Sequence, residues 1–189
     1  MTNWPDHYSH FPTLTTNLVH NDFCLRPIHW DNRNSIREWR NAQLDVLRQI
    51  EPLSASDQDR YFSETVLPQL DQEFPVQFMF AFLKDSQLVG YGALVHIHWG
   101  DHRAEVSFLT DPSRLNPPTF AADWSAYLHL LKPVATELGL HKLTTETYSL
   151  RSNLIPILEA NGFVQEGVLR EHHLVNGEFT DSHVHGLIL

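Results

Sequence analysis

The sequence predicts an α/β protein of the α+β kind with a mixed, mostly antiparallel sheet, and three observations lead to this prediction. The apolar run 76–83 and the segment 88–99 flank a short polar turn, which is the pattern of a β-hairpin. Residues 103–110 alternate at period two before a turn-rich passage and an amphipathic segment, which predicts a strand, a loop and a helix. Asn176-Gly177 separates two further strand-like segments and is a strong hairpin signal.

The first part of the chain is predicted to hold one strand and two helices. Residues 21–27 alternate apolar and polar side chains, as a strand does. An apolar stripe at helical spacing predicts a helix over 31–50, which Pro52 ends. Ser54 or Ser56 can cap the second helix, because each precedes an Asp by three residues and an apolar-periodic segment follows.

The second part of the chain is predicted to alternate helices and strands. A helix over about 120–138 has Thr119 as its expected N-cap. Residues 141–148 form a strand that is reached by a helical crossover, which is the connection that parallel pairing needs. A short helix over 154–160 then precedes the C-terminal hairpin.

Length and composition favour one folded domain over residues 21–189, preceded by an N-terminal extension over residues 1–20. A hydrophobic content of 42% is typical of a globular protein, and a net charge of −10 without a basic cluster argues against a nucleic-acid partner. No segment resembles a signal peptide or an apolar membrane span, and the single cysteine, Cys24, suits a reducing compartment. We therefore expect a cytoplasmic protein without membrane contact, as a monomer or homodimer.

Thirteen histidines raise the question of a metal site. Six of them form close pairs: His96/His98, His172/His173 and His183/His185. Residues two apart on a strand share one face, so ligation is geometrically feasible. No cysteine cluster or helical His-Glu-x-x-His spacing accompanies these pairs. We interpret the histidines as surface or core residues and predict no metal.

The order of elements and the C-terminal segment resemble a known family. From Leu158 the sequence reads LEANGFVQEGVLREHHLVNGEFTDSHVHGLIL, a short apolar helix, Gly-Phe, Glu-Gly, an Arg and a hairpin containing Asp. This pattern resembles the Gcn5-related N-acetyltransferase (GNAT) family, in the branch with the ribosomal-protein N-terminal acetyltransferases. Residues 37–41, REWRN, are similar to a segment of GNAT enzymes that acetylate amino sugars on nucleotides. The resemblance covers about residues 21–189 and implies the GNAT fold, whose central parallel strand pair splays around acyl-CoA.

The resemblance implies acetyl-CoA as cosubstrate. The strand 103–110 would bond the pantetheine amides, and the following loop and helix N-terminus would hold the pyrophosphate. The family's loop glycines are absent here, and Pro117 and Pro118 supply no N–H donors. The implied cofactor-binding residues are therefore Phe108, Leu109, Thr110, Arg114, Phe120, Ala121, Arg151 and Asn153.

The implied reaction is direct attack of a neutral primary amine on the thioester. Glu105 is the first candidate for the base and Glu146 the second. Leu158 stands where many members carry a proton-donating tyrosine, so Tyr148 or Ser152 is the candidate donor. The residues expected to line the acceptor pocket are Trp39, Arg40, Tyr61, His96, His98 and His172.

Three functions remain open at this stage. The first and leading one is an acetyl-CoA-dependent N-acetyltransferase acting on a small primary amine, for example an amino sugar. The second is an N-terminal protein acetyltransferase, for which an acidic surface suits basic ribosomal proteins. The third is a non-catalytic GNAT-like binding domain, which the loop without glycine favours.

Overall fold

One eight-stranded sheet forms the centre of the molecule. The computed structural model describes residues 4–15 and 18–189, and its strand order is β1-β2-β3-β4-β5-β6-β8-β7. The strands are β1 (Leu18–His20), β2 (Phe23–Pro27), β3 (Phe78–Lys84), β4 (Gln87–His98), β5 (Arg103–Thr110), β6 (Lys142–Tyr148), β7 (Val164–Val175) and β8 (Glu178–Ile188). Every neighbouring pair is antiparallel except β5 and β6. The predicted fold class, with its single parallel pair, is confirmed.

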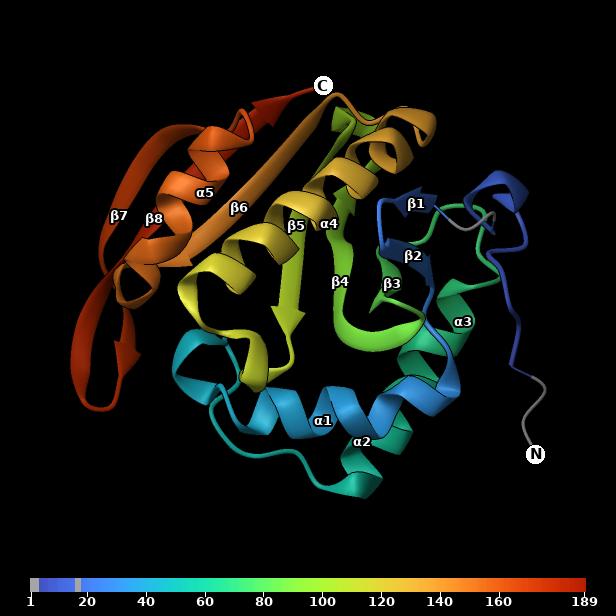
Figure 1. Cartoon of the computed structure of the whole chain (residues 1–189), viewed down its shortest axis with the longest axis horizontal. Coiled ribbons are helices and arrows are strands. Elements are labelled where there is room, and N and C mark those ends of the chain that lie inside the picture. Colours follow the sequence, from blue (N-terminus) through green and yellow to red (C-terminus); the bar gives the residue numbers. More distant parts are fainter. Residues whose placement is uncertain (1–3, 16–17) are drawn as a thin grey trace.

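Helices cover one face and one end of this sheet. They are α1 (Arg33–Asn41), α2 (Ala55–Tyr61), α3 (Leu67–Gln69), α4 (Pro117–Glu137) and α5 (Ile155–Ala160). In Figure 1, α4 and α5 lie over the same face, while α1 and α2 cross the end toward which β5 points. Within the described residues, no helix combines the length and the apolar character needed to cross a bilayer.

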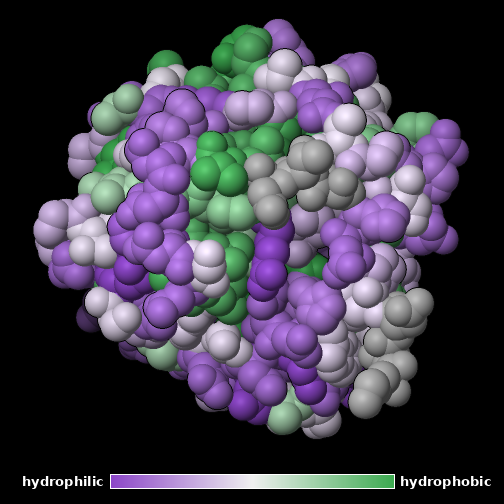
Figure 2. Space-filling model, turned by 45° about the vertical axis from the view of Figure 1, so that its right-hand side comes forward, coloured by the Kyte–Doolittle hydropathy of each residue, from purple (hydrophilic) through white to green (hydrophobic). Residues whose placement is uncertain are grey.

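The core extends from α4 across the sheet to α1 and the segment after α2. The ring of Phe108 on β5 stacks on Tyr127 of α4, with centroids 4.2 Å apart. A Cβ at Gly92 on β4 would lie 2.3 Å from the Tyr127 ring, so only glycine permits this close approach of helix and strand. On the surface drawn in Figure 2, apolar residues gather in a central band between hydrophilic ridges.

The N-terminal segment belongs to the domain, which corrects the expected extension over residues 1–20. Trp4 and Tyr8 are buried in the core, and the Met79 N–H donates to the Tyr8 hydroxyl oxygen at 2.6 Å. β1 pairs with β2 and extends the sheet. The sequence did not predict this burial, because the few large apolar side chains of the segment follow no helical or strand periodicity. Residues 1–3 and 16–17 of the expected extension lie outside the described residues.

The helix predicted over 31–50 is shorter than expected. α1 ends at Asn41, and a 3₁₀ turn over Leu44–Val46 follows. The Asn41 side chain bonds the backbone N–H and C=O of Leu53, and the Gln43 side chain donates to the Thr110 C=O at 2.9 Å. These tertiary contacts redirect the chain, which sequence periodicity does not reveal.

Candidate active site

The parallel pair β5–β6 opens into a cleft. Three positions pair: Arg103 with Lys142, Ala104 with Leu143, and Glu105 with Thr144. Beyond Glu105 and Thr144 the described strands have no register with each other, so the facing backbone edges lack a strand partner there. A cleft of about 440 Å³ lies at this divergence and is lined by side chains from β5, β6, α4 and the segment after α1.

One arginine joins the two candidate bases. Arg48 Nη2 lies 3.0 Å from Glu105 Oε1 and 2.6 Å from Glu146 Oε2. Burial lowers the pKa of Arg48, but attraction to the two carboxylates outweighs it and the net effect is a raised pKa. His96 is near the same group, with Nε2 3.5 Å from Arg48 Nη1. The structure thus gathers Glu105, Glu146 and His96, which are distant in sequence, around a residue that sequence reasoning did not single out.

Glu146 is held in its ionised form. Burial raises the pKa of its carboxyl, but hydrogen bonds from His173 and Arg48 prevail and lower the pKa to about 2. His173 Nε2 lies 2.8 Å from Glu146 Oε1. A carboxylate with so low a pKa takes up a proton poorly near neutral pH. Of the two glutamates, Glu146 is therefore suited to hold charge and Glu105 remains the first candidate for the base.

Tyr148 is the better placed of the two candidate proton donors. Its side chain lines the cleft, and its ring lies 4.3 Å from the His173 ring between centroids. Burial raises the pKa of Tyr148, so the phenol carries its proton at neutral pH. Ser152 and Asn153 are exposed on the turn after β6 and do not line the cleft.

Arg151 provides positive charge at the cleft. Its guanidinium lies 5.7 Å from the centroid of the Phe120 ring. Burial lowers the pKa of Arg151 to about 10, with the charge of Asp45 acting in the opposite direction. No described carboxylate forms an ion pair with it. A half-buried guanidinium without a carboxylate partner is suited to bind an anionic ligand.

Buried polar atoms without partners line the same cleft. They are Trp124 Nε1, Thr145 Oγ1 and Thr147 Oγ1, none of which has a hydrogen-bond partner among the described residues. An unpaired buried donor or acceptor costs about 1–3 kcal/mol. Because these atoms are inaccessible in the free chain, a polar ligand would bond them only after neighbouring side chains shift.

The loop from β5 to α4 is different, because its polar groups are already paired. Arg114 binds the fully buried Asp123 through two bonds, Nε to Oδ2 at 2.6 Å and Nη2 to Oδ1 at 2.7 Å. This pair occupies the guanidinium edge that the resemblance assigns to phosphate. Phosphate binding by Arg114 therefore has no support from the geometry and stays a prediction.

The start of α4 also differs from the prediction. Asn116, and not Thr119, is the N-cap, and Pro117 and Pro118 form the first turn. The Asn116 side chain accepts from the Thr119 N–H at 3.3 Å, and its C=O accepts from Phe120 N–H at 2.9 Å. Proline is favoured at the first helical position because its missing N–H has no intrahelical partner to lose. This helix start consequently offers few free donors to an anion, and roles for Phe120 and Ala121 stay predictions.

The other expected residues divide between the cleft and the core. Phe108 lines the cleft, whereas Leu109 is paired with Tyr91 in the sheet and the Thr110 C=O accepts from Gln43. Three of the expected acceptor-pocket residues, Arg40, Tyr61 and His96, also line the cleft.

Trp39 and His98 do not line the cleft, contrary to expectation. Trp39 is 7% exposed and packs in the core, because it lies on the inner face of α1. His98 is exposed at the end of β4, where its Nδ1 accepts from the Asp101 N–H. His172 lies near the cleft, with Nε2 3.9 Å from Glu146 Oε1. Periodicity and resemblance predict the helix or strand on which a residue lies. They do not predict whether its side chain faces the cleft, the core or solvent.

Solved structures show the same fold. A spermidine N-acetyltransferase from Vibrio cholerae in complex with CoA and spermine is 19% identical, with a TM-score of 0.77 over 89% of this chain and 96% of that chain. RimL, a ribosomal L7/L12 α-N-protein acetyltransferase in complex with CoA, is 13% identical, with a TM-score of 0.77 over 92% and 98% of the chains. At these identities the likeness is one of fold.

A family model gives the assignment. A search among curated proteins found no match. The model of the acetyltransferase (GNAT) domain matches residues 25–184, which is most of the chain. The chain therefore belongs to the acetyltransferase (GNAT) domain family, as its C-terminal motif predicted, and it is an acyltransferase of the GNAT type.

Proposed function

We propose that the chain transfers an acetyl group from acetyl-CoA to a small primary amine in the cleft between β5 and β6. One observation carries this proposal: the parallel pair separates after Glu105 and Thr144, and unpaired polar groups and two carboxylates line the opening. An extended, amide-containing arm between the strands would supply hydrogen bonds to the open backbone edge.

The cofactor is bound mainly by the cleft. The pantetheine arm lies along the open edge of β5 near Phe108, in the cleft that Thr147 and Trp124 also line. Arg151 takes the negative charge of the pyrophosphate, because the N–H groups at the start of α4 are absent or already bonded. A guanidinium binds phosphate through two parallel hydrogen bonds.

Glu105 and Tyr148 carry out the two proton transfers, and Glu146 acts through its charge. The amine nitrogen attacks the thioester carbon, and Glu105 takes the proton that the nitrogen loses. Glu146 stays ionised and stabilises the positive charge on the attacking nitrogen, since its pKa of about 2 prevents it from holding a proton. As the C–S bond breaks, Tyr148 donates a proton to the leaving thiolate.

The charges of the cleft favour an acceptor that is not a polycation. Three arginines line it against two glutamates: Arg40, Arg48, Arg151, Glu105 and Glu146. A multiply charged amine would be repelled by the arginines, whereas an amino sugar presents one amine, neutral hydroxyls and, when nucleotide-linked, phosphate for an arginine. We propose an amino sugar as the first acceptor class to test.

A peptide N-terminus is the second candidate. The fold resembles RimL over 92% of this chain. A peptide also presents one amine, and its carbonyl groups would accept hydrogen bonds from Arg40 or Arg48. A cytoplasmic location and a monomeric or homodimeric state accompany both candidates as predictions.

Calorimetry with acetyl-CoA tests the cofactor site. The wild-type chain should bind acetyl-CoA, and Arg151→Gln should bind about 10- to 100-fold more weakly, since a charge-assisted bond contributes about 1.5–3 kcal/mol. Acetyl-pantetheine lacks the pyrophosphate and should bind both proteins equally. Arg170→Gln, which changes an exposed arginine of β7, is the matched control. No binding of acetyl-CoA at high micromolar concentration would support a non-catalytic domain and overturn the proposal.

Thiol release from acetyl-CoA tests the acceptor and the base. An amino-sugar nucleotide, a peptide starting with Ser or Ala, and spermidine should be compared at equal concentration, and the first should be consumed fastest. Glu105→Gln should lower the rate about 10²- to 10⁴-fold while leaving acetyl-CoA binding intact. Full activity of Glu105→Gln at every pH would show that another group is the base.

A further inference from the structure

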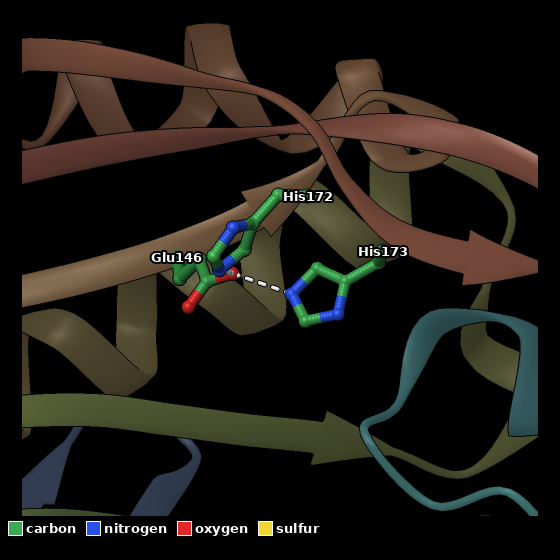
Figure 3. Close-up of side chains that lie close together, drawn as sticks. All are labelled: Glu146, His172 and His173. Atoms are coloured by element: carbon green, nitrogen blue, oxygen red, sulfur yellow. Dashed lines mark hydrogen bonds and ion pairs between the residues drawn. The ribbon is translucent and has the colours of Figure 1, made fainter.

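We propose that Glu146, His172 and His173 form a binding site for one divalent transition-metal ion of the Zn²⁺ type. The site lies beside the cleft, where two histidines of β7 come close to Glu146 of β6 (Figure 3). The sequence predicted no metal because the two histidines and the glutamate are more than twenty residues apart and match no metal motif. This proposal does not depend on acetyl transfer.

The three ligand atoms converge on one point. Glu146 Oε1 lies 2.8 Å from His173 Nε2 and 3.9 Å from His172 Nε2, and all three atoms lie within 4.8 Å of one another. Zinc bonds of about 2.0–2.1 Å at tetrahedral angles separate ligand atoms by roughly 3.3 Å. The observed separations lie on either side of this value, so small side-chain rotations suffice to surround an ion.

The backbone of β7 is shaped to bring both histidines to the same place. Consecutive residues of a regular strand point to opposite faces. Here the pairing of β7 with β8 shifts register between Leu169 and His173, and Glu171 has a left-handed φ of 51°. The Glu171 N–H donates to Asp181 Oδ1 at 2.8 Å and holds this conformation. The irregularity lets His172 and His173 both approach Glu146, as Figure 3 shows.

The surrounding charges leave one carboxylate oxygen for an ion. Arg48 binds Glu146 at Oε2, so Oε1 is the oxygen that faces the imidazoles. Arg48 thereby fixes the orientation of the Glu146 carboxylate. Residues that hydrogen-bond to a metal ligand from outside the metal site have the same effect. Arg48 also binds Glu105, so its single charge is shared between two carboxylates.

The ligand types and the number of ligands indicate which ion fits. Two imidazoles and one carboxylate suit Zn²⁺ and its late first-row neighbours better than Mg²⁺ or Ca²⁺, which prefer oxygen ligands. Three protein ligands leave one tetrahedral position for water. His172 is half exposed, which gives an ion access from solvent.

Titration of the metal-free full chain with Zn²⁺ in a calorimeter tests the site. One ion per chain should bind, and His172→Ala and His173→Ala should each weaken binding about tenfold or more. Glu146→Gln keeps the shape of the side chain and should have the same effect. His141→Ala, which removes an exposed histidine outside the cluster, should leave the affinity unchanged.

A Co²⁺ spectrum gives a second measurement that does not depend on stability. The wild-type chain should show the intense visible absorption of tetrahedral Co²⁺, which Zn²⁺ abolishes, and the His172→Ala/His173→Ala variant should lack it. Circular dichroism would verify that this variant is folded. No Zn²⁺ binding, or binding that persists in the folded double variant, would overturn the proposal.

Discussion

The cleft between β5 and β6 and the loop between β5 and α4 are neighbours, yet they differ in whether their arginines and buried polar atoms have partners within the protein. In the cleft, the buried Thr147 Oγ1 has no hydrogen-bond partner, and Arg151 forms no ion pair with a described carboxylate. In the loop, Arg114 is paired with Asp123, and Asn116 satisfies the start of α4. The difference indicates that the arginine available to an anion is Arg151 in the cleft, whereas Arg114 in the loop stabilises the fold.

Removing Arg114 should have the largest effect on stability. Arg114→Ala leaves the fully buried Asp123 carboxylate without its partner, which costs about 3–5 kcal/mol. Urea unfolding would measure this loss, with the exposed Arg170→Ala as the matched control. Arg114→Ala/Asp123→Ala should be less destabilised than the single variant, because no unpaired charge is buried. A loss below about 1 kcal/mol in Arg114→Ala would mean that the pair with Asp123 contributes little to stability.

Acid should weaken the cleft through Glu146. Its pKa is lowered to about 2 in the folded protein, so its contribution is present above the unfolded value of about 4.3 and is lost as pH falls toward 2. The contribution is at most about 3 kcal/mol, since one pKa unit corresponds to about 1.4 kcal/mol and water screens part of it.

Unfolding at pH 5 and pH 3 would measure the contribution of Glu146. Glu146→Gln should lose less stability between these two values than the wild-type chain, whereas Glu178→Gln, at an exposed position on β8, should behave as wild type. Equal pH dependence in Glu146→Gln and wild type would show that the ion pair with Arg48 does not stabilise the fold.

Filling the cleft with an apolar group should stabilise the free protein. Thr147→Val replaces an unpaired buried hydroxyl by a methyl group of similar size, which should raise the free energy of unfolding by about 1 kcal/mol. The same change should weaken acetyl-CoA binding if the hydroxyl serves the cofactor. Thr136→Val is the comparison, because the Thr136 hydroxyl donates to the Lys132 C=O. A loss of stability in Thr147→Val would indicate that the hydroxyl already has a partner.

Removing the cap of α4 should have a small effect that is confined to stability. Asn116→Ala loses the bond to the Thr119 N–H and should cost about 1 kcal/mol, as N-cap substitutions typically do. Acetyl-CoA affinity should stay constant, because we place the pyrophosphate at Arg151. Asn153→Ala, at an exposed position, is the control. If Asn116→Ala changed the affinity for acetyl-CoA and the control did not, the pyrophosphate would bind at the loop and not at Arg151.

Much of the fold could be predicted from local patterns. The alternation in β5, the turn at Asn176-Gly177 and the crossover to β6 are local features, and the structure confirms each of them. The end of α1 could not be predicted, since it depends on bonds from Asn41 to Leu53 and from Gln43 to Thr110. Such bonds join segments that are far apart in the sequence, and neither segment's own sequence predicts that the two lie close together in the fold.

The candidate site was predicted in part for the same reason. Glu105, Glu146, Tyr148 and Arg151 all line the cleft, because strand position and family resemblance fix which elements border it. Trp39 was expected there but is buried in the core. Arg48 was missed, since an arginine after a helix has no pattern that distinguishes a solvent-facing side chain from one between two carboxylates.

By itself the sequence determined the fold class, the single parallel pair and the family. These follow from periodicity, turn chemistry and a C-terminal motif, all of which are local in the chain. Tertiary structure alone decided which polar groups are paired: Arg48 between two glutamates, Arg114 on Asp123, and His172 and His173 beside Glu146. Pairing depends on distances of a few ångströms between residues far apart in sequence, and only the packed chain sets those distances.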